Sequence, residues 1–500
     1  MFTYVKERKG IVITGINGQC PKTLTIPTVI DGIRVIAVEK SAFFAKGELS
    51  EVIIEEGIKE IRDYAFSKAE NLMSISFPES LTKIKEGAFL GCGKLKEIYI
   101  KKNCRAIGNK AFSWCSGLTD VSFQGGSLLL GDSTFSFCGE LTEIEFKEGL
   151  KKIGQGAFSV CSNLKKIVTP SSLKEIGAQC FEGCNCLTDI YLKEGLQVIE
   201  SWAFRECKAL RSIILPKSLK KIGDGAFIGC IEIRSVKLPK GIGEISDWSF
   251  GKCRNIEYME VPEGISSIGS FSFSRCRRIK RLYLPKSLKV VKRGAFSVCL
   301  EMERIDFGYG VKILEENVFE MCGGLKWIRL PESVESIKQN VFYECKSLLG
   351  LEYEMKGQRV EYLYIPPIPR GLNFIKKMKK SGEKKIPWKY YDKMFDGLKK
   401  QEFKVEMAVY RLKNTMFLEK EAKEKYRNYL GRLSKKLILK AIEEDNIERL
   451  GFFGDEELIK KENAEEYIAF AAKSRGRGTG YLLDYKQKHF SNDKKRRFVL

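Results

Sequence analysis

Apolar residues recur along this chain with a period of 23 residues, much longer than the rhythm of a single helix or strand. A phenylalanine marks each period, and a cysteine follows three residues after each of the last twelve of them. The phenylalanines are Phe43, Phe66, Phe89, Phe112, Phe135, Phe158, Phe181, Phe204, Phe227, Phe250, Phe273, Phe296, Phe319 and Phe342. Because a unit of this length cannot bury its own apolar face, the repetition predicts a solenoid in which each turn packs on the next.

The phenylalanine and cysteine columns predict the core of that solenoid. An insertion of one residue would turn every later side chain out of its column, so the constant spacing is a packing requirement. We expect the structural core to include Phe89, Cys92, Phe158, Cys161, Phe227, Cys230, Phe296 and Cys299.

One complete repeat reads LRSIILPKSLKKIGDGAFIGC at residues 210–230. This pattern resembles the BspA-like class of bacterial leucine-rich repeats, and the resemblance extends over residues 11–353. It implies a repeat solenoid of about fourteen turns, with a curved parallel β-sheet along one face. Proteins of this class act as interaction surfaces, and several are cell-surface antigens or adhesins. The resemblance therefore implies protein binding on the concave sheet.

A different pattern begins after Phe342, where a Pro-rich and basic stretch leads into helical periodicity. Apolar residues then recur at i, i+3, i+4 and i+7, which predicts an all-α C-terminal domain. Helices are expected within residues 406–412, 424–444, 463–473 and 480–490. The last two resemble a degenerate ankyrin-type pair. The predicted organisation is a repeat domain at 1–353, a linker at 354–387 and a helical, ankyrin-like domain at 388–500. This domain either caps the last repeat or also binds a partner.

The variable positions of L-x-x-I-x-L project from the predicted sheet, because side chains alternate between the faces of a strand. In the later turns these positions hold Trp, Tyr and Arg, the residue types that anchor interfaces. We therefore predict a partner-binding stripe in which Trp327 is exposed. The stripe consists of Tyr258, Arg281, Tyr283, Arg304, Trp327 and Arg329. Docking of the helical domain and ordinary surface variation are the alternatives.

Charge supports a second interpretation. The formal net charge is +23, and basic residues are denser in the tail, from Lys376–Lys380 to Lys494–Arg497. Such charge raises affinity for nucleic acids and other anionic polymers, although lysine-rich faces are more often simply solvated. Arg475–Gly478, "RGRG", suggests RNA contact or a turn between helices.

The sixteen cysteines are expected to be mainly buried free thiols, which behave as small hydrophobic residues. Scattered disulfides are one alternative, and a metal site at Cys180, Cys184 and Cys186 is another, although the spacing there is a poor match to metal motifs. Many reduced thiols fit a reducing compartment.

Motifs of catalysis are missing from the sequence. Its only histidine is His489, and no phosphate-binding loop, nucleophile elbow or zinc-protease motif is present. We expect neither enzyme activity nor a cofactor or metal. No apolar run is long enough to span a membrane, and the opening MFTYVKERKGIVITG lacks the apolar stretch of a secretory signal, so a cytoplasmic location is expected. The sequence thus predicts a non-catalytic protein-interaction scaffold, with an exported surface adhesin as an alternative.

Overall fold

The computed structural model of the chain forms two compact units, Met1–Tyr362 and Leu363–Leu500. It describes residues 1–348, 350–355, 358–363, 392, 395–398, 401–413, 415, 418–474 and 476–490. The linker predicted at 354–387 lies almost entirely outside these residues, as do both of the lysine-rich tail segments.

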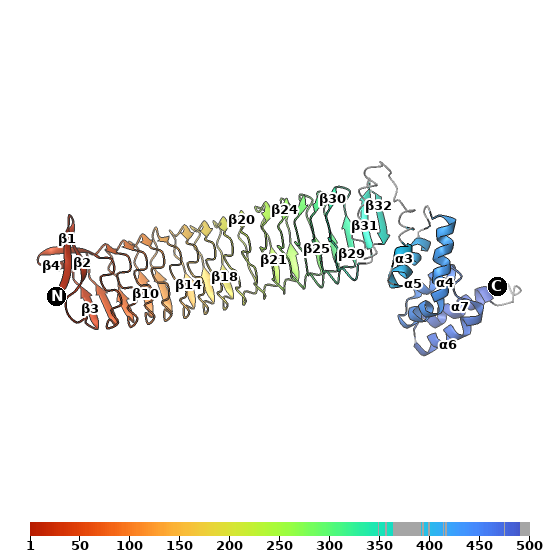
Figure 1. The fold of residues 1–500 in the computed structure, drawn as a ribbon, viewed down its shortest axis with the longest axis horizontal. Helices are drawn as coiled ribbons and strands as arrows, with labels where there is room; N and C mark the ends of the chain where they lie inside the picture. The colour runs from red at the N-terminus through yellow and green to blue at the C-terminus, as the bar shows by residue number, and fades with distance from the viewer. Residues whose placement is uncertain are drawn as a thin grey trace, which may run out of the picture. The chain divides into compact units, whose positions relative to one another are not determined.

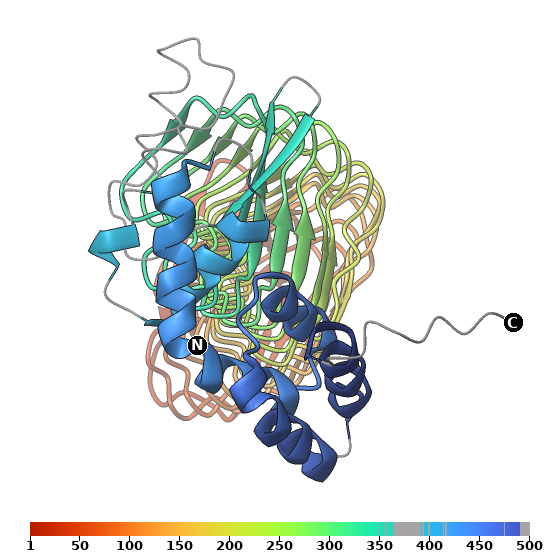
Figure 2. The same ribbon diagram turned by 90° about the vertical axis from the view of Figure 1, so that its right-hand side faces the viewer.

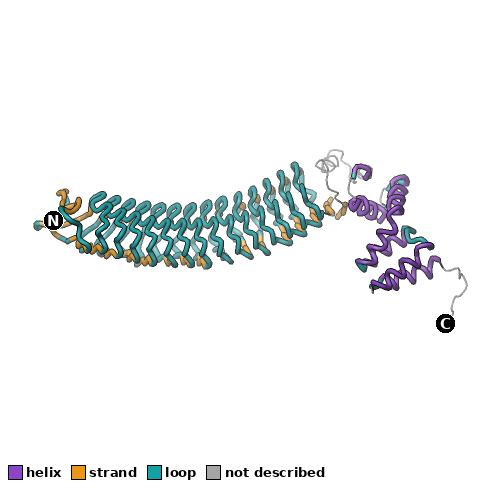
Figure 3. The backbone as a smooth tube through the Cα atoms, turned by 60° about the horizontal axis from the view of Figure 1, so that its bottom comes forward, coloured by secondary structure: helices purple, strands orange, loops and turns teal. Residues whose placement is uncertain are grey.

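The first unit is a solenoid of about fourteen turns of about 23 residues, which confirms the predicted fold class (Figure 1). Viewed along the solenoid, successive turns lie over one another (Figure 2). Most of each turn is loop, and short strands recur at equivalent places from turn to turn (Figure 3). Parallel pairing between equivalent strands keeps a register of 23 residues, as in Glu97↔Asp120 and Arg281↔Arg304.

The L-x-x-I-x-L segments form the predicted parallel ladder. Its strands are β3 (Thr23–Ile26), β6 (Glu51–Ile54), β8 (Ser74–Ser76), β10 (Glu97–Ile100), β12 (Asp120–Phe123), β14 (Glu143–Glu145), β16 (Lys166–Val168), β18 (Asp189–Tyr191), β21 (Ser235–Lys237), β23 (Tyr258–Glu260), β25 (Arg281–Tyr283), β27 (Arg304–Asp306), β29 (Trp327–Leu330) and β31 (Gly350–Met355). A further strand outside the repeat pattern, β32 (Gln358–Leu363), lies next to β31 at the end of the last sheet. The pairing divides into separate sheets between β12 and β14, between β18 and β21, and between β23 and β25. Between β18 and β21 one bridge is formed, Ser212↔Ser235.

A second parallel ladder, not predicted from the sequence, runs through the aliphatic residue, most often isoleucine, that lies five residues before the phenylalanine. Its strands are β7 (Glu60–Ile61), β9 (Lys83–Ile84), β11 (Ala106–Ile107), β13 (Leu129–Leu130), β15 (Lys152–Ile153), β17 (Glu175–Ile176), β19 (Val198–Ile199), β20 (Lys221–Ile222), β22 (Glu244–Ile245), β24 (Ser267–Ile268), β26 (Val290–Val291), β28 (Ile313–Leu314) and β30 (Ser336–Ile337). At two residues per turn, these strands are too short to show an alternating pattern in the sequence.

The N-terminal end of the second ladder is closed by other strands. β1 (Phe2–Glu7) and β2 (Gly10–Ile16) form an antiparallel hairpin, and β2 pairs in parallel with β5 (Ile33–Val38). β4 (Val29–Ile30) pairs with the start of β5. The first repeats therefore do not expose an open sheet edge at this ladder.

The core is a column of phenylalanine rings between the two ladders. Neighbouring rings stack with centroids 5.1–5.8 Å apart from Phe43 to Phe342. All eight residues named as structural core are 0% exposed. Each of the twelve ladder cysteines donates its thiol to the carbonyl of the phenylalanine one turn earlier, at Sγ–O distances of 2.9–3.3 Å.

The backbone conformation beside the phenylalanine accounts for the two glycines of the segment GAFIGC at residues 225–230. Two residues before and two after each ladder phenylalanine, the backbone is left-handed, as at Gly225 (φ 58°) and Gly229 (φ 78°). Glycine adopts this conformation without steric cost, whereas Trp202 and Phe271 hold it in other turns despite their side chains. The backbone geometry therefore recurs in every turn, although the glycine does not.

Four glutamates join consecutive turns along one edge of the solenoid. In each, the carboxylate accepts the backbone N–H groups of two residues in the following turn, at 2.8–3.1 Å, which lowers its pKa. These clamp glutamates are Glu56, Glu148, Glu194 and Glu263.

The second unit is helical. Its helices are α3 (Gln401–Lys413), α4 (Lys420–Glu443), α5 (Ile447–Asp455), the short 3-10 helix η1 (Lys461–Asn463), α6 (Ala464–Ser474) and α7 (Gly478–Phe490). The four predicted helical segments lie on α3, α4, α6 and α7. Helix α5 was not predicted, although Asn446 caps it by accepting the Arg449 N–H at 3.0 Å, and asparagine is a recognisable N-cap residue.

A buried polar cluster holds this unit together. Arg411 is 0% exposed and donates to both carboxylate oxygens of Asp392, at 2.8 and 3.1 Å. Tyr426 donates its hydroxyl to the same carboxylate at 2.6 Å, and burial together with this bond raises the Tyr426 pKa. The charges are therefore matched inside the core.

Candidate partner-binding face

In the first ladder, which runs from β3 to β31, two side chains of each turn point outward. They lie eight and ten residues after the phenylalanine of that turn. We call this surface, from Glu51 and Ile53 to Trp327 and Arg329, the strand face. The residue between the two outward side chains is buried in every turn of the strand face except that of Phe66, where Ile75 is half-buried; Leu282 and Ile305 are 1% and 0% exposed. The alternation that the sequence predicted therefore places a regular, two-column array of side chains in solvent.

The six predicted stripe residues all lie on the strand face. Arg281, Arg304 and Trp327 are direct neighbours in one column of β25, β27 and β29. In the other column Tyr283 and Arg329 flank Asp306. Tyr258 lies on β23, which packs beside β25. The stripe is thus one continuous patch.

Exposure within the stripe differs from the prediction in one respect. Tyr258 and Tyr283 are 59% and 66% exposed, and Arg281 is exposed too. Trp327 is half-buried rather than exposed. Arg304 is also half-buried, because its Nε donates to Asp306 Oδ2 at 2.9 Å. The two tyrosines, not the tryptophan, are the most accessible apolar groups of the stripe.

The sequence analysis missed how far the apolar positions extend along the strand face. Ile214 is 82% exposed, Tyr191 is 54% exposed and Tyr99 is 45% exposed, all in the column of Tyr283. The register of the later turns had already placed Ile214 among the outward positions, although the predicted stripe did not include it; applied to the earlier turns, it would also have identified Tyr99 and Tyr191. Exposed aromatic side chains that recur in one column mark an interaction surface more strongly than scattered ones do.

Charge on the strand face is divided along the solenoid. In the turns of Phe43 to Phe135 the outward positions carry only acidic charge, at Glu51, Glu97, Asp120, Glu143 and Glu145. In the turns of Phe227 to Phe319 basic residues predominate, at Lys237, Arg281, Arg304 and Arg329 against Glu260 and Asp306. The turns between them are neutral overall, with Lys166 offset by Asp189. The strand face is therefore acidic at one end and basic at the other.

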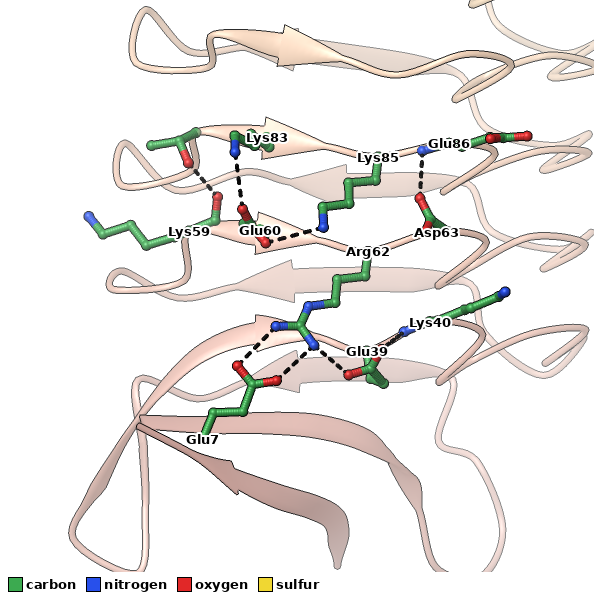
Figure 4. Close-up of polar contacts among 11 residues, drawn as sticks. Glu7, Glu39, Lys40, Lys59, Glu60, Arg62, Asp63, Lys83, Lys85 and Glu86 are labelled. Atoms are coloured by element: carbon green, nitrogen blue, oxygen red, sulfur yellow. Dashed lines mark hydrogen bonds and ion pairs between the residues drawn. The ribbon is translucent and has the colours of Figure 1, made fainter. Parts of the chain in front are cut away.

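The second ladder presents charges that pair with one another (Figure 4). Arg62 donates to Glu7 at 2.9 and 3.1 Å and to Glu39 at 2.6 Å, which ties the N-terminal hairpin to the first repeats. Glu60 lies between Lys83 and Lys85, at 3.5 and 3.6 Å. These charges act mainly within the solenoid. On the strand face, by contrast, Arg281 has no ion pair among the described residues.

Fifteen of the sixteen cysteines are buried. Burial raises the pKa of the Cys92 and Cys161 thiols to about 12. Of the three cysteines considered as metal ligands, Cys180 and Cys184 are buried whereas Cys186 is exposed. Within the described part of the chain no three His, Cys, Asp or Glu side chains are grouped as a metal site would require.

Two other candidate features are accounted for locally. His489 stacks on Tyr485 at the end of α7, with ring centroids 4.3 Å apart. Arg477 of the RGRG segment donates its backbone N–H and its Nε to Asp445, at 2.8 and 3.1 Å. Among the helices that the structure describes, none has the length and hydrophobicity needed to cross a bilayer.

This architecture defines a leucine-rich-repeat solenoid. The family model described as "BspA type Leucine rich repeat region (6 copies)" matches residues 36–139, 128–257 and 243–362, and the chain belongs to this family. Among solved structures, it is similar to a leucine-rich repeat protein from Bacteroides ovatus, with 24% identity and a TM-score of 0.56 over 70% of this chain and 92% of that one. A leucine-rich cell surface protein from Faecalibacterium prausnitzii is 22% identical, with a TM-score of 0.41 over 71% of this chain and 93% of that one. No curated protein matches the sequence. The resemblance stated from the repeats is thereby confirmed for the solenoid; for the helical unit the ankyrin-like relation stays a prediction.

Proposed function

We propose that this chain is a non-catalytic protein-interaction scaffold whose partner binds the strand face. The observation that carries the proposal is the column of exposed apolar side chains along that face, with Ile214 82% and Tyr283 66% exposed. Tyrosine brings large contact area and a hydrogen-bonding hydroxyl at small entropic cost, which suits a binding surface. All the thiols except that of Cys186 are buried, and the family and fold are generally non-enzymatic.

The domain organisation belongs to the same proposal: a repeat domain at 1–353, a linker at 354–387 and a helical, ankyrin-like domain at 388–500. The location we propose is the cytoplasm, where sixteen reduced thiols would persist. Export as a surface adhesin is the alternative, and fractionation of the native cell distinguishes the two.

Binding of a nucleic acid or other anionic polymer receives less support. Arg304 and Arg477 are each held by an aspartate, and the strand face carries acidic residues along its first turns. If such binding were the function, affinity would fall steeply with salt because counterions are released. A protein interface with apolar anchors depends less on salt.

The test is capture of partners from a native cell lysate by the intact chain. Tyr258→Ser with Tyr283→Ser removes two large exposed side chains of the strand face and should abolish capture. The core should stay intact, because neither side chain is buried. The matched control is Tyr309→Ser with Tyr343→Ser, since these tyrosines are 55% and 54% exposed and lie outside the strands. Equal capture by both double variants would refute the proposal.

A further inference from the structure

The strand face is nearly self-complementary about its own midpoint. Its outward residues change from acidic in the first turns to basic in the last, and the turn of Phe204 lies between these regions. That turn presents Ser212 and Ile214, and Ile214 is 82% exposed. An apolar centre with opposite charges on its two sides fits a copy of itself turned end over end.

We propose that the strand face binds the strand face of a second copy of this chain, with the two solenoid axes antiparallel. The inference rests on the proposed function and names the partner. The symmetry is a two-fold axis that lies between the faces and runs along the strand direction through Ile214. Two-fold symmetry is the commonest form of homodimer, and it makes each contact occur twice.

This axis determines which residues meet. Ile214 of one copy faces Ile214 of the other, and one turn away Tyr191 faces Lys237. Three turns away Glu143 faces Arg281, and a turn further Asp120 faces Arg304. In both outward columns, no pair of like charges meets from the turn of Phe89 to that of Phe319. Arg211, which precedes the strand, would face its own copy at the rim, where solvent screens the repulsion.

The alternative two-fold axis, along the solenoid, is disfavoured by the same charges. It would set each turn against the same turn of the other copy, so that Glu143 and Glu145 would meet a second acidic pair. Arg281 would face Tyr283 of the other copy and would lose the Glu143 that the antiparallel arrangement sets against it. Like charges brought together at an interface oppose association, so the antiparallel arrangement is selected.

Sheet twist limits the extent of the contact. Two face-packed sheets cross at roughly 30°, so opposed columns diverge with distance from the axis. Contact over the seven turns from Phe135 to Phe273 corresponds to about 30 Å of ladder at about 4.8 Å per strand. With two outward side chains per turn, seven turns supply about fourteen residues from each copy, fewer than the roughly 20–30 per side of a standard interface, so the dimer should be weak and sensitive to salt.

Sedimentation velocity of the full chain, over a concentration series up to ~100 µM, tests the proposal with charge reversals. Glu143→Lys and Arg281→Glu each reverse one side of the facing pair, and each should weaken dimerisation at least tenfold. An equimolar mixture of the two variants should recover a heterodimer, because both copies of the contact then join opposite charges. The matched control is Glu335→Lys. Glu335 is exposed and directly precedes β30 of the second ladder, so its charge reversal should leave the dimer unchanged.

A wild-type chain that stays monomeric throughout the series overturns the inference. So does a dimer that both reversals leave intact, or a mixture that stays monomeric. Ile214→Asp gives an independent check, since a charge placed against its own copy at the axis should abolish the dimer. If the chain is monomeric and its lysate capture still requires Tyr258 and Tyr283, the partner is a different protein: the inference fails and the proposed function stands.

Discussion

Replacing Phe227 by alanine should open the solenoid locally at the middle of the ring column. The Phe227 side chain is 0% exposed, and its ring stacks on Phe204 at 5.3 Å and on Phe250 at 5.4 Å. Removing a buried phenylalanine costs about 3–5 kcal/mol. Each stacked pair of rings contributes about 0.5–1.5 kcal/mol of that cost. Because Phe227→Ala removes two such pairs, its destabilisation should lie toward the upper end of the range.

Phe43→Ala is the matched comparison, because Phe43 is equally buried but stacks on one ring, Phe66, at 5.1 Å. Its cost should fall toward the lower end of the same range. In a solenoid each turn contacts only its neighbours, so destabilisation should concentrate in the turns next to the substituted one.

Hydrogen exchange followed by mass spectrometry measures this directly. The Phe204 N–H donates to Ala226 O and the Phe227 N–H to Ser249 O, both at 2.8 Å, so peptides over these turns report local opening. In Phe227→Ala they should lose the most protection. A cost below ~1 kcal/mol, or an equal loss in every turn, would refute the reasoning from stacked neighbours.

Two other predictions concern ionisable groups. The backbone N–H groups that the clamp glutamates accept lower the pKa of their carboxyl groups from 4.5. Their contribution to the stability of the fold is therefore complete above the unfolded-state pKa, and it is lost as pH falls through the lower folded-state pKa. Changing all four to glutamine should therefore flatten the acid limb of the stability curve between about pH 5 and pH 3, and an unchanged acid limb would contradict this. In the helical unit, Asp392→Ala removes the carboxylate that accepts two hydrogen bonds from the fully buried Arg411 and should cost about 3–5 kcal/mol, measured from the helical circular dichroism signal in denaturant. Asp396→Ala is its control, since the Asp396–Lys425 pair is exposed and should contribute less than about 1 kcal/mol.

The solenoid could be predicted from the sequence because every turn packs with the same residue types at the same positions. Phe227 and Cys230 occupy the same environment as Phe89 and Cys92, so each repeat is an independent observation of the same buried column. The second ladder escaped prediction because two residues per turn leave no pattern beyond a recurrent isoleucine. Helix α5 is only nine residues long, and its cap at Asn446 was its clearest signal.

The candidate site could be located from the sequence only in part. Strand alternation places Tyr258 and Tyr283 in solvent, and the structure has both exposed. The half-burial of Trp327 and the pairing of Arg304 with Asp306 depend on neighbouring side chains, which alternation alone does not specify. Ile214 and Tyr191 were left out of the predicted stripe because each looks ordinary in its own repeat and gains significance only from its place in a shared column.

Hydroxyl-radical footprinting tests the central claim, that partners bind the strand face, more directly than any other measurement. The chain would be labelled after capture of its partner from native lysate and, separately, as dilute purified protein. Tyr99, Tyr191, Tyr258 and Tyr283 should be protected in the captured state, whereas Tyr309 and Tyr343 should be labelled equally in both. Protection of the latter two tyrosines alone, or unchanged labelling of the four on the strand face, would contradict the account.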